Sequence, residues 1–172
     1  MRTRPAPPFG ELIAATERSA VHLELRDAYT PEDPAFRRWL AGESVNVVEA
    51  EREWFDIVRD ATARGVSMRR IRVVSEPLAP YPAFEHECTH ALNITAGEQV
   101  RWLPRKHTGD LLLPGLDYWL FDDHTVRFHH FAGDGTWLYD EVTNDREAIE
   151  RCAASFAAAW DRAMPHEEYH PA

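Results

Sequence analysis

Residues 45–76 read VNVVEAEREWFDIVRDATARGVSMRRIRVVSE, and this stretch decides the fold class. Its first part predicts a helix, because apolar residues recur with a helical period at Val48, Trp54, Ile57, Val58 and Ala61. Gly65 is a typical helix stop, and the VSMRRIRVVSE that follows it has the β-branched content of a strand. A helix, a glycine and a strand in direct succession indicate an α/β domain.

The same alternation of elements continues on both sides of this stretch. Upstream, SAVHLEL (19–25) predicts a half-buried strand, in which Val21 and Leu23 face one way and His22 and Glu24 the other. Downstream we expect a helix over 82–93, a strand over 99–104, and strands separated by DD (122–123) and GDG (133–135). A long amphipathic helix over 144–164 ends the pattern. Arg72 and Glu24 both lie on expected central strands, so we predict an internal ion pair between them.

Composition excludes several classes of function. The 172 residues carry a net charge of −10, which disfavours direct binding of nucleic acid or anionic membranes. No apolar run is long enough for a membrane helix, and no secretory signal is visible at the N-terminus. Two isolated cysteines fit a reducing compartment, so we expect a cytoplasmic protein. We expect residues 1–10 to form a flexible arm and residues 11–172 a single domain.

Residues 86–90 read HECTH, which matches the H-E-x-x-H pattern of zinc hydrolases. In that pattern His86 and His90 would bind the metal, and Glu87 would act as the general base. However, both histidines point away from the apolar stripe of the expected helix, and the common continuation would need glycine and histidine where Asn93 and Ala96 stand. We therefore predict a solvent-exposed polar helix face and no metal cofactor, and keep a zinc hydrolase as the alternative.

Histidines are also grouped in DDHTVRFHH (122–130). Adjacent residues of a strand point to opposite faces, so His129 and His130 cannot serve one site, and polar edge positions are the favoured interpretation. No nucleophile elbow or phosphate-binding loop is present in the sequence. Trp102 and Trp119, on neighbouring expected strands, are suited to line a pocket.

The order of these motifs resembles one half of the phospholipase D-like fold. The resemblance lies in a helix ending in Gly65-Val66, a strand ending in Asp122-Asp123, and a terminal helix with Phe156 and Trp160. From RSAVHLELRDAY (18–29) to WDRAMPHEEY (160–169), the chain further resembles a family of actinobacterial domains of unknown function that are often encoded near helix-turn-helix regulators. The resemblance implies an α/β domain with a mixed central sheet flanked by helices.

The catalytic motif of phospholipase D-like enzymes, H-x-K-x-x-x-x-D, is absent. Aligning its Asp with Asp122 places Gly115 and Asp117 at the His and Lys positions, and aligning it with Asp123 places Leu116 and Tyr118 there. Neither alignment supplies a nucleophile or a cation. The resemblance therefore implies the fold without its chemistry.

These observations favour a non-catalytic regulatory or ligand-sensing domain that acts with a protein partner, such as a helix-turn-helix regulator. A ligand is expected at the carboxyl ends of the central strands, near Ser75, Glu76, Arg105, Asp122 and Trp119. The alternative is an enzyme: the zinc hydrolase above, or a biosynthetic enzyme with a repurposed cleft around Asp117, Asp122 and His124. Because the fold is half of a two-half arrangement, we also expect a homodimer.

Overall fold

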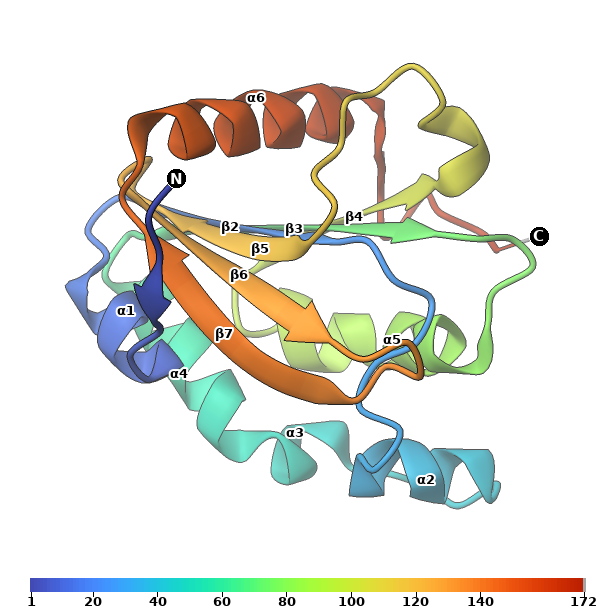
Figure 1. Ribbon diagram of the computed structural model, residues 1–172. Coiled ribbons are helices and arrows are strands. Elements are labelled where there is room, and N and C mark those ends of the chain that lie inside the picture. The colour runs from blue at the N-terminus through green and yellow to red at the C-terminus, as the bar shows by residue number, and fades with distance from the viewer. Residues whose placement is uncertain (172) are drawn as a thin grey trace.

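The computed structural model, which describes residues 1–171, contains an open eight-stranded sheet with helices on both faces (Figure 1). The strand order is β1-β7-β6-β5-β2-β3-β4-β8. At the centre, β2 (Ser19–Glu24), β3 (Ser67–Val74) and β4 (Gln99–Pro104) run parallel. Beside β2, the strands β5 (Asp117–Phe121), β6 (Thr125–Phe131) and β7 (Trp137–Thr143) are antiparallel. The predicted α/β class with a mixed central sheet is confirmed.

The helices cover the two faces unequally. The long helix α6 (Arg146–Arg162) lies across one face of the sheet (Figure 1). The opposite face carries α1 (Phe9–Ala15), α4 (Arg52–Ala63) and α5 (Pro80–Thr89), with α2 (Pro34–Leu40) and α3 (Val47–Ala50) beyond them (Figure 1). A π-helical turn, His90–Ile94, extends α5, and a 3-10 turn, Arg105–His107, follows β4. None of the helices in residues 1–171 is long and apolar enough to cross a membrane.

Alternation along the strands builds two apolar cores. Val21, Leu23, Ile71 and Val73 point towards α6 and pack with Phe156. On the other face, apolar strand residues pack against α1 and α4 and include Ala20, Met68, Trp119 and Phe121. Of the stripe predicted before Gly65, Val58 and Ala61 are buried, and Val48, Trp54 and Ile57 pack against this core partly buried. Phe55, which was not predicted, is also buried, and the expected single helix is divided into α3 and α4. This second core covers only part of its face of the sheet.

The remainder of that face carries polar side chains that are nevertheless buried. His22 and Glu24 are only 8% and 6% exposed, so the expectation of a half-buried β2 is wrong. The reason is that α5 and the loop before α2 lie over the polar positions and shield them from solvent. The predicted ion pair is confirmed, with Arg72 Nε donating to a Glu24 oxygen at 2.8 Å.

Two end segments of the chain add short edge strands to the sheet. Residues 1–10 were predicted to be a flexible arm, but Arg4 and Pro5 form β1 on the edge of β7, and α1 already begins at Phe9. The free backbone edge of β7 explains this pairing, because it offers unpaired donors and acceptors. At the other end of the sheet, β8 (Met164–Pro165) pairs with β4.

Candidate functional site

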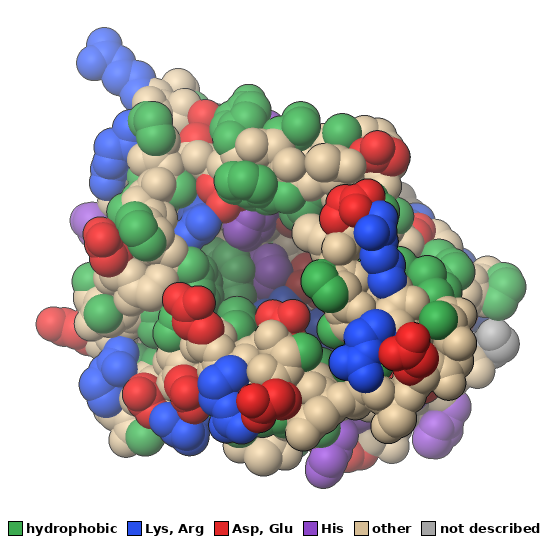
Figure 2. Space-filling model, turned by 90° about the horizontal axis from the view of Figure 1, so that it is seen from below, with side chains coloured by type: hydrophobic (Ala, Val, Ile, Leu, Met, Phe, Trp, Pro, Cys, Tyr) green, Lys and Arg blue, Asp and Glu red, His purple; other side chains and the backbone are tan. Residues whose placement is uncertain are grey.

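A cavity of about 500 Å³ lies between the polar part of the sheet and the helices α2 to α5. Figure 2, which views this face, shows the hollow with histidine and charged side chains inside it. Its wall combines strand residues of β2, β3, β5 and β6 with the loop around Tyr29 and with α5. The cavity lies against the face of the sheet, over Glu24 at the end of β2 and over Arg70 and Arg72 in the middle of β3.

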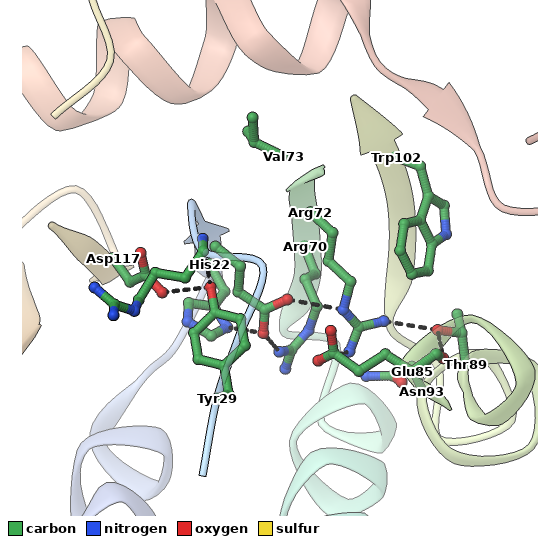
Figure 3. Close-up of polar contacts among 12 residues, drawn as sticks. His22, Tyr29, Arg70, Arg72, Val73, Glu85, Thr89, Asn93, Trp102 and Asp117 are labelled. Carbon is green, nitrogen blue, oxygen red and sulfur yellow. Dashed lines mark hydrogen bonds and ion pairs between the residues drawn. The ribbon is translucent and has the colours of Figure 1, made fainter. Parts of the chain in front are cut away.

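The floor of the cavity is a charged network formed by alternate residues of two parallel strands. The register pairs His22 with Arg70 and Glu24 with Arg72 across β2 and β3. Glu24 accepts from both guanidiniums: Arg72 Nε donates to one carboxylate oxygen at 2.8 Å, and Arg70 Nη1 donates to the other (Figure 3). One carboxylate thus bridges two buried arginines.

The polar side of α5 and the turns after it complete this network. Arg72 Nη1 donates to Thr89 Oγ1 at 2.6 Å, and its Nη2 lies 3.1 Å from Glu85 Oε1. Arg70 Nε donates to Glu98 Oε1 at 3.0 Å, and the Asn93 amide donates to the second oxygen of Glu98. Isolated buried charges are costly, so this pairing is what allows both guanidiniums to remain inside the fold.

Burial also shifts the protonation of the carboxyl groups around the cavity. It raises the pKa of Glu85 to about 8, although the guanidinium of Arg72 opposes the shift. Glu24 behaves in the opposite way: burial opposes ionisation, but two arginines hold the pKa below its ordinary value. At neutral pH the Glu24 carboxylate is therefore ionised between the two guanidiniums, whereas the Glu85 carboxyl is mostly protonated.

A second cluster, at the first residue of β5, forms another wall. Tyr29 donates its hydroxyl proton to Asp117 Oδ2 at 2.6 Å, and the Leu25 amide donates to Oδ1 at 3.0 Å. Burial raises the pKa of Asp117 to about 6, while the Tyr29 hydrogen bond opposes that shift. Figure 3 shows Asp117 and Tyr29 next to His22 on one side of the charged network.

Two imidazole rings face the cavity beside this cluster. His129 Nδ1 lies 2.8 Å from Asp140 Oδ1, and Arg127 donates to the other oxygen of that carboxylate at 2.5 Å. His22 stacks on Trp119, with ring centroids 4.3 Å apart. Among the described residues, His22 Nδ1 and His129 Nε2 are buried without a hydrogen-bond partner, and His22 Nδ1 lies 3.4 Å from a Glu24 oxygen.

Three of the predicted ligand-binding residues come together, but outside this cavity. Arg105 Nε donates to Ser75 Oγ at 3.1 Å, and Lys106 Nζ lies 2.7 Å from Glu76 Oε2. Ser75, Glu76 and Arg105 line a separate pocket of about 680 Å³ where β3 and β4 end. Arg105 also donates to the Leu25 carbonyl and so joins the ends of the parallel strands. A ligand there stays a prediction.

Asp122 and His124 lie at the opposite end of the sheet from Asp117. The expectation of Asp122 at the carboxyl strand ends is wrong because β5 runs antiparallel to β2, which brings its first residue, Asp117, to the cavity. Asp122 instead accepts from the backbone amides of residues 17, 18 and 19, and His124 is exposed in the β5–β6 turn. The expected cleft that unites Asp117, Asp122 and His124 is therefore not formed.

Trp119, also predicted to bind a ligand, is 3% exposed and supports the site from behind by stacking on His22. Trp102 lies away from it, stacked on Tyr169 with ring centroids 5.3 Å apart. The two tryptophans therefore do not line one pocket.

The HECTH residues point in three different directions. Glu87 is exposed and accepts from Trp39 Nε1 at 2.8 Å, and His90 is also exposed. His86 was expected to face solvent but is half-buried against Trp102 and Tyr169. Within residues 1–171, no group of three or more His, Cys, Asp or Glu side chains is placed to hold a metal ion.

Most of the residues that form the cavity were not predicted from the sequence. Glu24, Arg72 and Asp117 were predicted to take part in an ion pair or a cleft, whereas His22, Arg70, Glu85 and the role of His129 were not. A signal was present, because HLE and RRIR place charged or polar residues at every second position of two central strands. Such residues in a buried parallel sheet must find partners inside the fold. The helix over 82–93 was expected to pack against the sheet through its apolar residues. The polar residues of α5 were therefore expected to face solvent and not the cavity.

Comparison with known proteins identifies the family. Residues 7–171 match the family model described as "Domain of unknown function (DUF6879)". The chain belongs to this family. Among curated proteins, none matches the sequence. The resemblance to a family of domains of unknown function is thus confirmed, and it covers nearly the whole chain.

Solved structures support the phospholipase D-like fold. NucT from Helicobacter pylori has a TM-score of 0.52 at 11% identity, covering 91% of this chain and 87% of that one. Nuc from Salmonella typhimurium, a phospholipase D family member, has a TM-score of 0.50 at 12% identity, covering 91% and 86%. TrmBL2, an archaeal chromatin protein, has a TM-score of 0.48 at 15% identity; the chain covers 95% of its own length but only 54% of TrmBL2. These likenesses concern the fold alone.

Proposed function

We propose that this domain is a non-catalytic ligand sensor that binds a small molecule in the cavity beneath the sheet. The observation that carries the proposal is the cavity of about 500 Å³, whose wall joins a hydrogen-bonded ionic network to aromatic rings. This volume is in the range of small-molecule sites, and convergent polar groups with shifted pKa values are typical of such sites.

Incubation with a metabolite extract, followed by native mass spectrometry, tests this proposal. We expect the protein to retain a small molecule of defined mass. The variant Leu92→Trp, which places a large ring at the cavity wall, should lose it. The matched control Leu112→Trp changes a side chain that is 94% exposed and should retain it. A wild-type protein that retains nothing, or equal retention by both variants, would contradict the proposal.

The chemical state of the groups at the cavity wall supports a sensor over an enzyme. Burial raises the pKa of Cys88, the thiol at the cavity wall, to about 12, so it is not a thiolate at neutral pH. The arginines are occupied by carboxylates, and the Tyr29 hydroxyl proton is donated to Asp117.

A second candidate function is general-base catalysis by His129. It is favoured by the 2.8 Å contact of His129 Nδ1 with Asp140 and by the unpartnered Nε2 beside the cavity. If the retained molecule leaves the cavity chemically unchanged, and His129→Gln only weakens its retention, the sensor is supported. Conversion of the molecule by wild-type protein, lost in His129→Gln, would support the enzyme.

The regulatory part of the proposal requires a partner. We propose that the domain passes the ligand signal, in the cytoplasm, to a protein such as an actinobacterial helix-turn-helix regulator encoded nearby, and that it does not itself contact nucleic acid. Three consecutive apolar residues of β7, Trp137, Leu138 and Tyr139, are about half exposed and support a protein contact.

The proposal involves no metal cofactor. Elemental analysis of protein purified without added zinc tests this point, and near-equimolar zinc that disappears in His90→Ala would contradict it.

A further inference from the structure

The wall of the cavity carries more acidic than basic side chains. Its cations are Arg70 and Arg72, and its carboxyl groups are Glu24, Asp33, Glu51, Glu85 and Asp117. Both arginines are already neutralised, Arg70 by Glu24 and Glu98, and Arg72 by Glu24 with Glu85 beside it. An anionic ligand would therefore meet no uncompensated positive charge among the described wall residues.

Three of the carboxyl groups lack a cationic partner within the described chain. Asp33 accepts from the backbone amides at the start of α2, at 2.7 and 3.2 Å, and Asp117 accepts from Tyr29 and a backbone amide. Glu51 is half-buried, and burial, followed by the nearby charge of Asp33, raises the pKa of Glu51. Each of these groups would be stabilised in its charged form by a cation inside the cavity.

Aromatic side chains supply the rest of the wall. Tyr81 lies between Tyr29 and Phe84, with ring centroids 5.7 and 6.0 Å away, and Phe131 packs 5.3 Å from Tyr29. The faces of such rings attract cations and also accommodate an apolar body. Rings combined with carboxylates are complementary to an organic cation.

His22 is a second and independent indication of a ligand. Its side chain is buried at the cavity wall, and Nδ1 has no hydrogen-bond partner, although a Glu24 oxygen lies 3.4 Å away. Burial, followed by the charge of Arg70, holds the pKa of His22 well below its ordinary value, so the ring is neutral. A neutral imidazole has one nitrogen that accepts, and an ammonium group has three donors to offer.

We propose that the ligand of this cavity is a small organic cation, an amine with an aromatic or aliphatic body. This inference rests on the proposed function and specifies the chemical class of its ligand. The carboxyl groups of Asp33, Glu51 and Asp117 in the cavity wall attract the ammonium group, and the apolar body lies against the aromatic wall. The negative net charge of the whole chain favours the approach of such a ligand.

Three probes of matched shape and different charge test this assignment: 2-phenylethylamine, 2-phenylethanol and phenylacetate. Their binding to the full chain is measured at neutral pH by ligand-observed NMR and calorimetry. We expect the amine to bind at least about tenfold more tightly than either of the others, as one ion pair in a partly desolvated site allows. Glu51→Gln should weaken the binding of the amine by about three- to tenfold. Glu147→Gln, which changes an exposed side chain on α6, should leave the affinity for the amine unchanged.

Each outcome has a distinct meaning. Tightest binding of the amine, lost in part with Glu51→Gln, supports the inference. Tightest binding of phenylacetate or 2-phenylethanol, or retention of an anionic metabolite from the extract, overturns the charge assignment and leaves the sensor intact. If no probe binds and no metabolite is retained, both proposals fail.

Discussion

Glu85 is the residue at which burial and ion pairing oppose each other most directly. Its carboxyl group faces Arg72, yet burial raises its pKa to about 8. The neighbouring charge of Glu24 adds to this shift, because two carboxylates share the guanidiniums. The protonation of this single group therefore links the stability of the fold to pH.

Glu85→Gln is expected to remove a dependence of stability on pH between 6.5 and 8. In this window the folded carboxyl group still binds a proton that the unfolded chain has released. The free energy of unfolding of the wild type therefore falls as pH rises, by at most about 1.4 kcal/mol per pH unit for one proton. His22 opposes this trend near pH 6.5, because its unfolded ring is about half protonated there while the buried ring is neutral. Above about pH 7.5 the contributions of His22 and of Asp117, with a pKa of about 6, are small.

Urea denaturation at several pH values across this window measures the slope. Glu147→Gln, a carboxyl change on the exposed side of α6, should keep the wild-type slope. An unchanged slope in Glu85→Gln would show that another group is responsible.

Glu24→Gln is expected to destabilise the fold by about 3–5 kcal/mol, because it leaves two buried guanidiniums without their shared carboxylate. The matched control is Glu43→Gln, which breaks an exposed 2.9 Å pair with Arg38 and should cost less than about 1 kcal/mol. Both losses in unfolding free energy are measured from the shift of the urea midpoint, provided that the dependence of the free energy on urea concentration is unchanged. Similar losses for the two variants would mean that the buried network contributes little.

At the scale of elements, the π-helical turn after α5 shapes the cavity. It continues the helix through His90–Ile94, places Leu92 and Asn93 at the cavity wall, and brings the Asn93 amide within 2.5 Å of Glu98. Such turns are rare and occur frequently at functional sites. The β6–β7 turn closes another side, where Thr30 donates its amide proton to the Gly135 carbonyl at 2.9 Å.

Gly135→Ala tests that turn. Gly135 has φ +91°, and an added Cβ would lie 2.9 Å from the Ala28 carbonyl oxygen, so the substitution strains the backbone next to Tyr29. We expect a loss of about 1–3 kcal/mol in stability, together with weaker ligand retention. Gly133→Ala, in the same turn, meets nothing within 4 Å and should be close to neutral. Thermal unfolding compares the two, and equal midpoints would refute the argument.

At the scale of the whole molecule, the free edge of β7 is the surface most suited to pair with a second copy. β1 covers only the end of this strand, at Glu141 and Val142, and leaves Trp137, Leu138 and Tyr139 about half exposed. An unprotected edge with apolar residues is a template for strand pairing.

We expect the wild type to sediment as a homodimer at micromolar concentrations. Leu138→Glu should convert it to a monomer by placing a charge at the edge. The control Leu40→Glu, at a side chain of similar exposure on α2, should remain dimeric. A monomeric wild type in analytical ultracentrifugation would refute the dimer.

The sequence by itself determined the α/β class, the principal strands and helices, and the pair between Glu24 and Arg72. These follow from local periodicity, from the glycine after the first long helix, and from opposite charges on two central strands. The sequence also determined that the His and Lys of the phospholipase D-like motif are replaced by other residues, since a motif is a property of the chain alone.

Only the tertiary structure decided where the site lies. The antiparallel direction of β5 brings Asp117 rather than Asp122 to the cavity, and no local pattern encodes strand direction. The placement of α5 over the sheet turns the polar residues His22, Arg70 and Glu85 from apparent surface into a buried network. Periodicity predicts which residues share one face of a helix or strand. It does not predict which other segments of the chain pack against that face, and these segments decide whether the residues are buried.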